Sequence, residues 1–138
     1  AVNDAEHYET LQEALDAYGI TEFREPTWIP EGYEFESVHV KSWPSDGSLI
    51  GIQARYFDGS NFLQIQLERY DGNAIIQVEK TKTSLESFLI DGLAVYLLEN
   101  VNSNSVAWAT EHYECYISGA VEKQVLKQIV LSVYTHTP

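Results

Sequence analysis

Several residue types are scarce in this sequence. It has no methionine, one cysteine, and 8 Lys and Arg residues against 21 Asp and Glu residues. Because methionine is missing even at position 1, we expect the chain to be a trimmed or processed form of a longer product. A lone cysteine excludes an internal disulfide. The formal net charge of −13 disfavours a nucleic-acid or anionic-membrane surface, so we expect no nucleic-acid partner.

Long hydrophobic runs are also missing. No apolar stretch approaches the roughly 18 residues that a membrane-spanning helix needs. The composition is nevertheless that of a folded protein, since hydrophobic residues make up 44% and charged residues 21% of the chain. Its length of 138 residues suits one ordinary domain. We therefore expect residues 1–138 to form a single domain, with residues 1–8 as a mobile lead.

Helical periodicity is confined to the two ends of the chain. Thr10 and Glu13 have the spacing of a capping box, and apolar residues then follow at helical intervals until Gly19, which suits a helix stop. A second helix is predicted near the C-terminus, where apolar residues recur four apart: Val121, Val125, Ile129 and Val133.

Between these helices the hydrophobic pattern has a period of two. Apolar residues alternate with Gln64 and Gln66, and a change of phase between Phe35 and Val38 predicts a β-bulge. The pattern predicts an α+β fold, an antiparallel meander sheet of six or seven strands with an N-terminal helix and a C-terminal helix packed on it. The expected common core comprises Leu63, Ile65, Leu67, Val95, Leu97, Tyr113, Cys115, Ile117, Val125 and Ile129.

Signals for catalysis or metal binding are sparse. His112 and Glu114 lie two residues apart on a predicted strand, so both would share a face and offer two metal ligands. No HExxH, CxxC or calcium-loop spacing accompanies them, and Cys115 fits a small buried hydrophobe. We expect no catalytic residue, no bound metal and no cofactor.

Aromatic residues gather around the first predicted long strand, and three of them are candidate ligand-binding residues. Trp28, Tyr33 and Trp43 would offer stacking faces to a sugar or a hydrophobic ligand if their rings are exposed. The alternative is that these rings belong to the core. Trp43, beside the Pro44 turn, is the strongest candidate for exposure.

The string Trp28-Ile29-Pro30-Glu31-Gly32-Tyr33 resembles the opening motif of DUF4367, a bacterial domain family of unknown function. The resemblance continues through Ile90–Tyr96 and Tyr116–Gly119 and covers about residues 8–134. It implies an exported domain of a bacterial envelope protein, often behind one membrane-spanning helix, so the full-length protein would be membrane-anchored. It implies no catalytic residues.

Two functions follow as hypotheses. The first is a non-enzymatic extracytoplasmic module that senses or binds an envelope peptide, lipid or glycan. The second is an envelope hydrolase that uses scattered carboxylates, with a metal near His112. An apolar concavity over the sheet would favour the first function, whereas a cleft with convergent acids and strongly shifted pKa values would favour the second.

Overall fold

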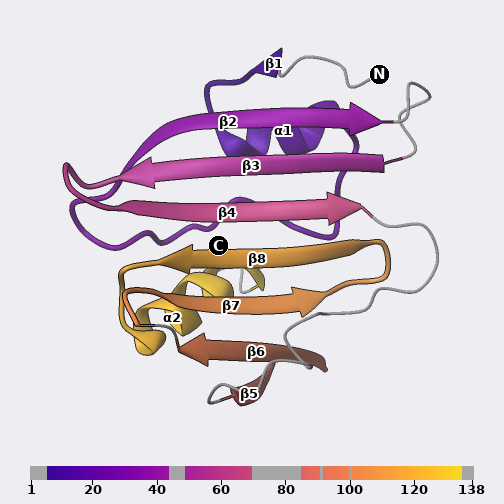
Figure 1. The fold of residues 1–138 in the computed structure, drawn as a ribbon. Helices are drawn as coiled ribbons and strands as arrows, with labels where there is room; N and C mark the ends of the chain where they lie inside the picture. Colours follow the sequence, from indigo (N-terminus) through magenta and orange to yellow (C-terminus); the bar gives the residue numbers. More distant parts are fainter. Residues whose placement is uncertain (1–5, 44–48, 70–84, 91, 100, 135–138) are drawn as a thin grey trace.

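The computed structural model describes residues 6–43, 49–69, 85–90, 92–99 and 101–134. Within these residues, strands form one antiparallel sheet, and two helices lie on one of its faces (Figure 1). The elements in chain order are β1 (Glu6–His7), α1 (Leu11–Ala17), β2 (Glu34–Trp43), β3 (Leu49–Phe57), β4 (Phe62–Arg69), β5 (Leu85–Ile90), β6 (Leu93–Glu99), β7 (Asn104–Ala109), β8 (Tyr113–Gly119) and α2 (Lys123–Tyr134).

The sheet consists of two meanders that meet in its centre. Its strand order is β1-β2-β3-β4-β8-β7-β6-β5, so the last strand, β8, pairs with β4 (Figure 1). The predicted α+β class, antiparallel pairing and terminal helices are confirmed. The very short β1 joins the seven longer strands, and the strand expected around residues 76–80 lies outside the described residues.

Local signals at the start of the chain act as the sequence predicts, with one difference. The Thr10 hydroxyl oxygen accepts from the Glu13 backbone N–H at 3.1 Å, and Gly19 ends the helix at a φ of 67°. The Glu13 carboxylate, however, accepts from the Glu9 backbone N–H instead of that of Thr10. Upstream, Glu6–His7 pairs with β2 as β1, so part of the expected mobile lead is a strand.

The predicted β-bulge in β2 is present. The pairing of β2 with β3 shifts between Phe35 and Ser37, so that Val38 and Val40 face the same side of the sheet as Ile52 and Ala54. Without this extra residue, the apolar set of β2 would change faces along the strand.

One face of the sheet, here called the covered face, carries the core. Residues from both helices and from the connection between α1 and β2 lie in the same hydrophobic cluster as the strands. In that connection, Phe23 stacks on the buried Trp108 ring with a centroid distance of 6.0 Å. The main core residues outside the strands are Leu11, Leu15, Ile20, Phe23, Leu126, Ile129, Val130 and Val133.

The predicted core residues are all buried except Val125, which is half-buried. The buried stripe of α2 includes Leu126, Ile129, Val130 and Val133, which is the i, i+3, i+4, i+7 pattern of a helix on a flat surface. The predicted row at i, i+4 spacing drifts around the helix axis, so Val125 lies at the edge of that stripe, and Val121 precedes the helix.

Candidate functional site

The three aromatic residues predicted to bind a ligand do not form one cluster. Trp28 and Tyr33 are half-buried and pack against the core, and Tyr33 follows a turn in which its N–H donates to the Pro30 carbonyl at 3.2 Å. Trp43 ends β2, ten residues further on, which is roughly 30 Å along an extended strand. The side chain of Trp43 lies outside the described residues, and the binding role of all three residues stays a prediction.

His112 and Glu114, the pair considered as metal ligands, have different partners in the structure. His112 lies in the turn before β8, and its Nδ1 atom is 2.5 Å from Glu22 Oε2. Glu114 instead accepts from the Tyr116 hydroxyl at 2.5 Å. Within the described part of the chain, no group of three or more His, Cys, Asp and Glu side chains could hold a metal ion.

Glu22 joins the connection after α1 to the turn between β7 and β8. Its Oε1 accepts from the Thr110 hydroxyl at 2.5 Å and from the His112 backbone N–H at 3.0 Å. Partial burial alone would raise the pKa of Glu22, but these hydrogen bonds and the contact with His112 lower it below its usual value. Glu22 therefore joins the Thr110 hydroxyl and the His112 ring, one at each of its carboxylate oxygens.

The lone thiol is part of the core. Cys115 is fully buried, and burial, followed by the charges of Glu22 and Glu114, raises the pKa of its thiol strongly. A thiol reacts as its thiolate, which this environment disfavours. Cys115 therefore acts as a small core residue, as the sequence predicts.

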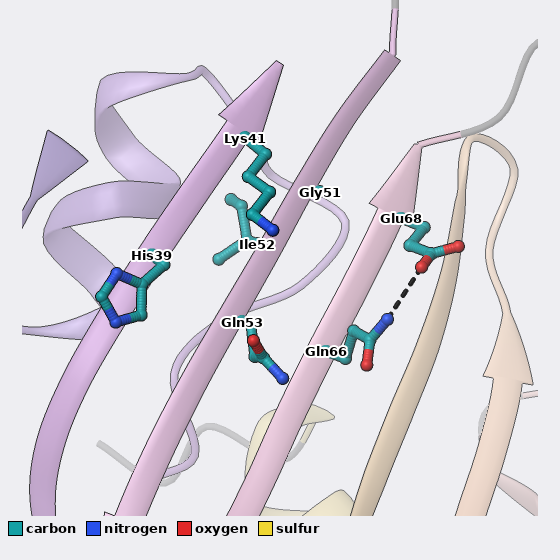
Figure 2. Close-up of a pocket in the computed structure, with 7 residues that line it drawn as sticks. All are labelled: His39, Lys41, Gly51, Ile52, Gln53, Gln66 and Glu68. Atoms are coloured by element: carbon teal, nitrogen blue, oxygen red, sulfur yellow. Dashed lines mark hydrogen bonds between the residues drawn. The ribbon is translucent and has the colours of Figure 1, made fainter. Parts of the chain in front are cut away.

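The second face of the sheet, here called the open face, carries a hollow at Gly51. Gly51 of β3 pairs with Lys41 of β2 and with Glu68 of β4, so two charged side chains flank a strand position without a side chain (Figure 2). His39, Gln53 and Gln66 complete the polar lining of this hollow, whose volume is about 210 Å³. A glycine inside a strand often marks a position that another molecule approaches closely.

A second hollow continues the first across the sheet. Ser105, Tyr116 and Ser118 of β7 and β8 line it together with Gln66 and Glu68, which belong to both hollows. We call the combined feature the open-face groove; its polar lining is formed by His39, Lys41, Gln53, Gln66, Glu68, Ser105, Tyr116 and Ser118 around Gly51. It crosses five adjacent strands, a span of about 19 Å at the usual strand spacing.

Gln66 and Tyr116 of the groove are held by neighbours on the same face. The Gln66 Nε2 group donates to Glu68 Oε1 at 2.7 Å, and the Gln66 oxygen points away from Glu68 (Figure 2). The Tyr116 ring packs on a small apolar cluster with Leu98 and Ala107, and burial and the bond to Glu114 raise the pKa of its hydroxyl strongly. The groove is therefore a polar surface with its amide and ring already oriented, and it differs from the apolar concavity that would favour the first hypothesis.

Part of this groove can be predicted from the sequence. The alternation of Gln64, Gln66 and Glu68 with apolar residues identifies one polar face, and Gly51 stands inside a strand pattern. What the sequence does not give is the pairing that places Gly51 between Lys41 and Glu68 and brings Tyr116 beside Gln66.

The fold and the groove define an α+β domain with one covered and one open sheet face. The chain belongs to the family described as a domain of unknown function, DUF4367, whose model matches residues 24–133. This match confirms the resemblance carried by the Trp28–Tyr33 motif. No curated protein matches the chain.

Among solved structures, the chain is similar to a protein in the crystal structure of MucB in complex with MucA(peri). The identity is 13% and the TM-score 0.45, and the match covers 86% of this chain. The chain spans 38% of the length of that protein. Among the described residues, no helix is long and apolar enough to cross a membrane.

Proposed function

We propose that this domain is a non-catalytic binding module of a bacterial envelope protein and that its ligand lies in the open-face groove. The observation that carries this proposal is the hollow at Gly51, which is flanked by Lys41 and Glu68 where β3 pairs with both of its neighbours. Glycine inside a strand lowers stability by about 0.5–1 kcal/mol relative to alanine. A glycine at this position would let a ligand approach the sheet, which gives a functional reason for its presence.

The arrangement of polar groups supports binding rather than catalysis. Gln53 and Gln66 offer amide donors and acceptors, and the serines of the second hollow offer hydroxyls, none of which activates a nucleophile. Glu68 lines the groove, and Glu114 pairs with it across β4 and β8 on the same face. Both carboxylates already accept side-chain hydrogen bonds, Glu68 from Gln66 and Glu114 from the Tyr116 hydroxyl, so both have partners within the domain.

A location outside the cytoplasm is part of the same proposal. It is supported by the DUF4367 resemblance, which implies exported domains tethered to the bacterial envelope. Protease added to intact protoplasts that express the full-length protein tests this part. Cleavage of the domain without cell lysis is expected, and protection of the domain until lysis would contradict an extracytoplasmic location.

Binding itself is tested by co-sedimentation with purified cell-wall and membrane fractions of a Gram-positive bacterium. Wild type should pellet with one of these fractions, and Gly51→Val, which fills the hollow, should stay in the supernatant. Gln128→Ala, on the exposed side of α2, is the control and should pellet like wild type. Pelleting of Gly51→Val like wild type would exclude the groove, and no pelleting of wild type would contradict envelope binding.

A further inference from the structure

A cavity of about 190 Å³ lies where the end of β4 meets the start of β8. These two strands are neighbours in the sheet, and Arg69 pairs with Tyr113 across them (Figure 1). The connection after α1 and the turn before β8 complete the wall. The side chains that line the cavity are those of Tyr18, Thr21, Glu22, Arg69, His112 and Tyr113.

Tyr113 brings a free hydroxyl group to this cavity. Its ring belongs to the main core, and the residue is only 6% exposed. Within the described part of the chain, the hydroxyl has no hydrogen-bond partner. Because every fully buried side-chain nitrogen and oxygen of these residues is paired, the hydroxyl must reach accessible space. The cavity is the space that Tyr113 lines, so a group bound there can supply the missing partner.

Arg69 is the second group of the cavity without a partner. Among the described residues, its guanidinium forms no ion pair or hydrogen bond, although the chain has 21 Asp and Glu residues against 8 Lys and Arg. Burial raises the pKa of the Tyr113 hydroxyl more than the nearby Arg69 lowers it, so this hydroxyl is protonated at neutral pH. Tyr113 and Arg69 therefore offer O–H and N–H donors close together.

The Glu22 carboxylate does not satisfy these donors. Its Oε1 atom accepts from the Thr110 hydroxyl and the His112 backbone, and its Oε2 atom contacts the His112 ring. Glu22 also offsets one of the two cationic side chains of the lining, Arg69 and His112. Glu111 belongs to the same turn as His112 but does not line the cavity. The lining therefore has donors in excess and at most one positive charge in excess.

A carboxylate group matches this lining in charge and in hydrogen bonding. It carries one negative charge, accepts hydrogen bonds on two oxygens and pairs with the forked N–H groups of arginine. A phosphate dianion carries more charge than the lining can balance in a protein of formal net charge −13. That overall charge is screened beyond about 8 Å at physiological salt, so the nearby donors decide whether a monoanion binds.

We infer that this cavity binds the carboxylate group of a small organic acid or of a peptide chain end. Arg69 and the Tyr113 hydroxyl hold its oxygens, the Thr21 hydroxyl adds a donor, and the Tyr18 ring forms a wall for the adjoining carbon atoms. The cavity is smaller than the roughly 300–1,000 Å³ of drug-sized pockets, so it accepts the carboxylate and a few further atoms.

This site is separate from the open-face groove. Arg69 and Tyr113 lie in the rows of β4 and β8 that face the covered side, whereas Glu68 and Glu114 lie in the rows that face the open side. The inference therefore goes beyond the proposed function and adds a second ligand.

The experiment is a titration of the whole chain with N-acetylalanine, followed by amide chemical shifts. The acid should bind saturably in the millimolar range expected of so small a ligand, with shifts concentrated at Thr21, His112 and Tyr113. N-acetylalanine amide, a neutral molecule of the same shape, should bind at least about tenfold more weakly. Inorganic phosphate should also bind more weakly than the acid. Equal binding of acid and amide, tighter binding of phosphate, or no binding of the acid would each overturn the inference.

Single variants then locate the carboxylate. Tyr113→Phe removes the free hydroxyl and Arg69→Gln removes the guanidinium, and each should weaken the acid about tenfold or more. Arg69→Lys keeps the charge without the fork and should restore only part of the affinity. Arg55→Gln removes the same charge from an exposed position on the open face and should bind like wild type. Because Arg69 is exposed, its variants test the site even if Tyr113→Phe does not fold. Wild-type affinity in Arg69→Gln would overturn the assignment to this cavity.

Two further acids distinguish the sources of the carboxylate. Similar affinities for propionate and N-acetylalanylalanine would support a small organic acid, and tighter binding of the dipeptide would support a chain end. The proposed function does not depend on these results, because envelope binding by the open-face groove is tested separately with Gly51→Val.

Discussion

The two faces of the sheet are built from the same strands but have opposite chemistry. On β4, Leu63, Ile65 and Leu67 are buried beneath the helices, whereas the intervening Gln64 and Gln66 lie half-buried on the open face. The covered face is closed by α1, α2 and the connection between α1 and β2. The open face is instead hollowed at Gly51.

Because of this difference, the covered face supplies most of the folding stability, and the open face can be used for binding. Apolar area removed from water stabilises the fold by roughly 25 cal/mol per Å², and nearly all of the main core lies on the covered face. Among the described residues, the open face has a small apolar cluster, in which Tyr96 and Tyr116 pack on Leu98 and Ala107, and a stacked pair of rings, Phe57 and Phe62. Residues of the groove are therefore available for ligand contacts without a large effect on folding.

The largest expected effect comes from the covered face. Ile65 is fully buried in the centre of the sheet, so Ile65→Ala should lower the free energy of unfolding by about 2–5 kcal/mol through lost burial and a residual cavity. The neighbouring change Gln66→Ala, on the open face, should alter it by less than about 0.5 kcal/mol. Urea denaturation of both variants measures the contrast. Similar losses in the two variants would contradict the assignment of the faces.

A second expected effect concerns a polar contact inside the covered layer. The indole N–H of the buried Trp108 donates to the Tyr134 hydroxyl at 2.7 Å, and the two rings meet edge to face. Tyr134→Phe keeps the ring but leaves the indole N–H without this acceptor, which should lower the free energy of unfolding by about 1–3 kcal/mol. Thermal and urea denaturation measure the loss. An unchanged stability would show that the indole has another acceptor.

The sequence predicts the two faces well because alternation is a local property. Each strand's inward and outward residues follow from a period of two, and the bulge after Phe35 is visible as a change of phase. The half-burial of Val125 was missed because the packing surface decides which helical rows become buried. Contacts set by distant pairing are also missed: Glu22 meets His112 across 90 residues of chain.

The candidate site was less predictable for the same reason. The sequence identified Trp28, Tyr33 and Trp43 as binding residues from their nearness along the chain. Tyr33 immediately precedes β2 and Trp43 ends it, whereas the groove combines residues from strands β2, β3, β4, β7 and β8. Such a combination depends on strand order, and local pattern does not determine that β8 returns to pair with β4.

A smaller effect on the free energy of unfolding is expected from Glu22, which joins the connection after α1 to the turn between β7 and β8. Its pKa is lower in the folded protein than its usual value of 4.5, because hydrogen bonds from Thr110 and His112 outweigh the effect of burial. The stability that it contributes is therefore fully present above the unfolded pKa. It is lost as the pH falls through the folded pKa.

Glu22→Gln tests this pH dependence. At pH 7 the variant should be about 1 kcal/mol less stable than wild type, a value reduced for partial exposure of the carboxylate. The difference should shrink as the pH falls below about 4.5, the usual pKa of the group. Glu31→Gln, at an exposed turn position, removes one negative charge as a control. A difference that stays constant from pH 7 to pH 3 would contradict the carboxylate's role.

The smallest expected effect, a gain in stability, comes from the open face. Gly51 lies inside β3 and pairs on both sides, so Gly51→Val replaces a flexible residue by one that favours strands. The free energy of unfolding should rise by about 0.5–1 kcal/mol, as measured by urea denaturation. Loss of stability would mean that the hollow is too narrow for a side chain. A gain in stability, combined with loss of envelope binding, would show that Gly51 admits a ligand and is not needed for folding.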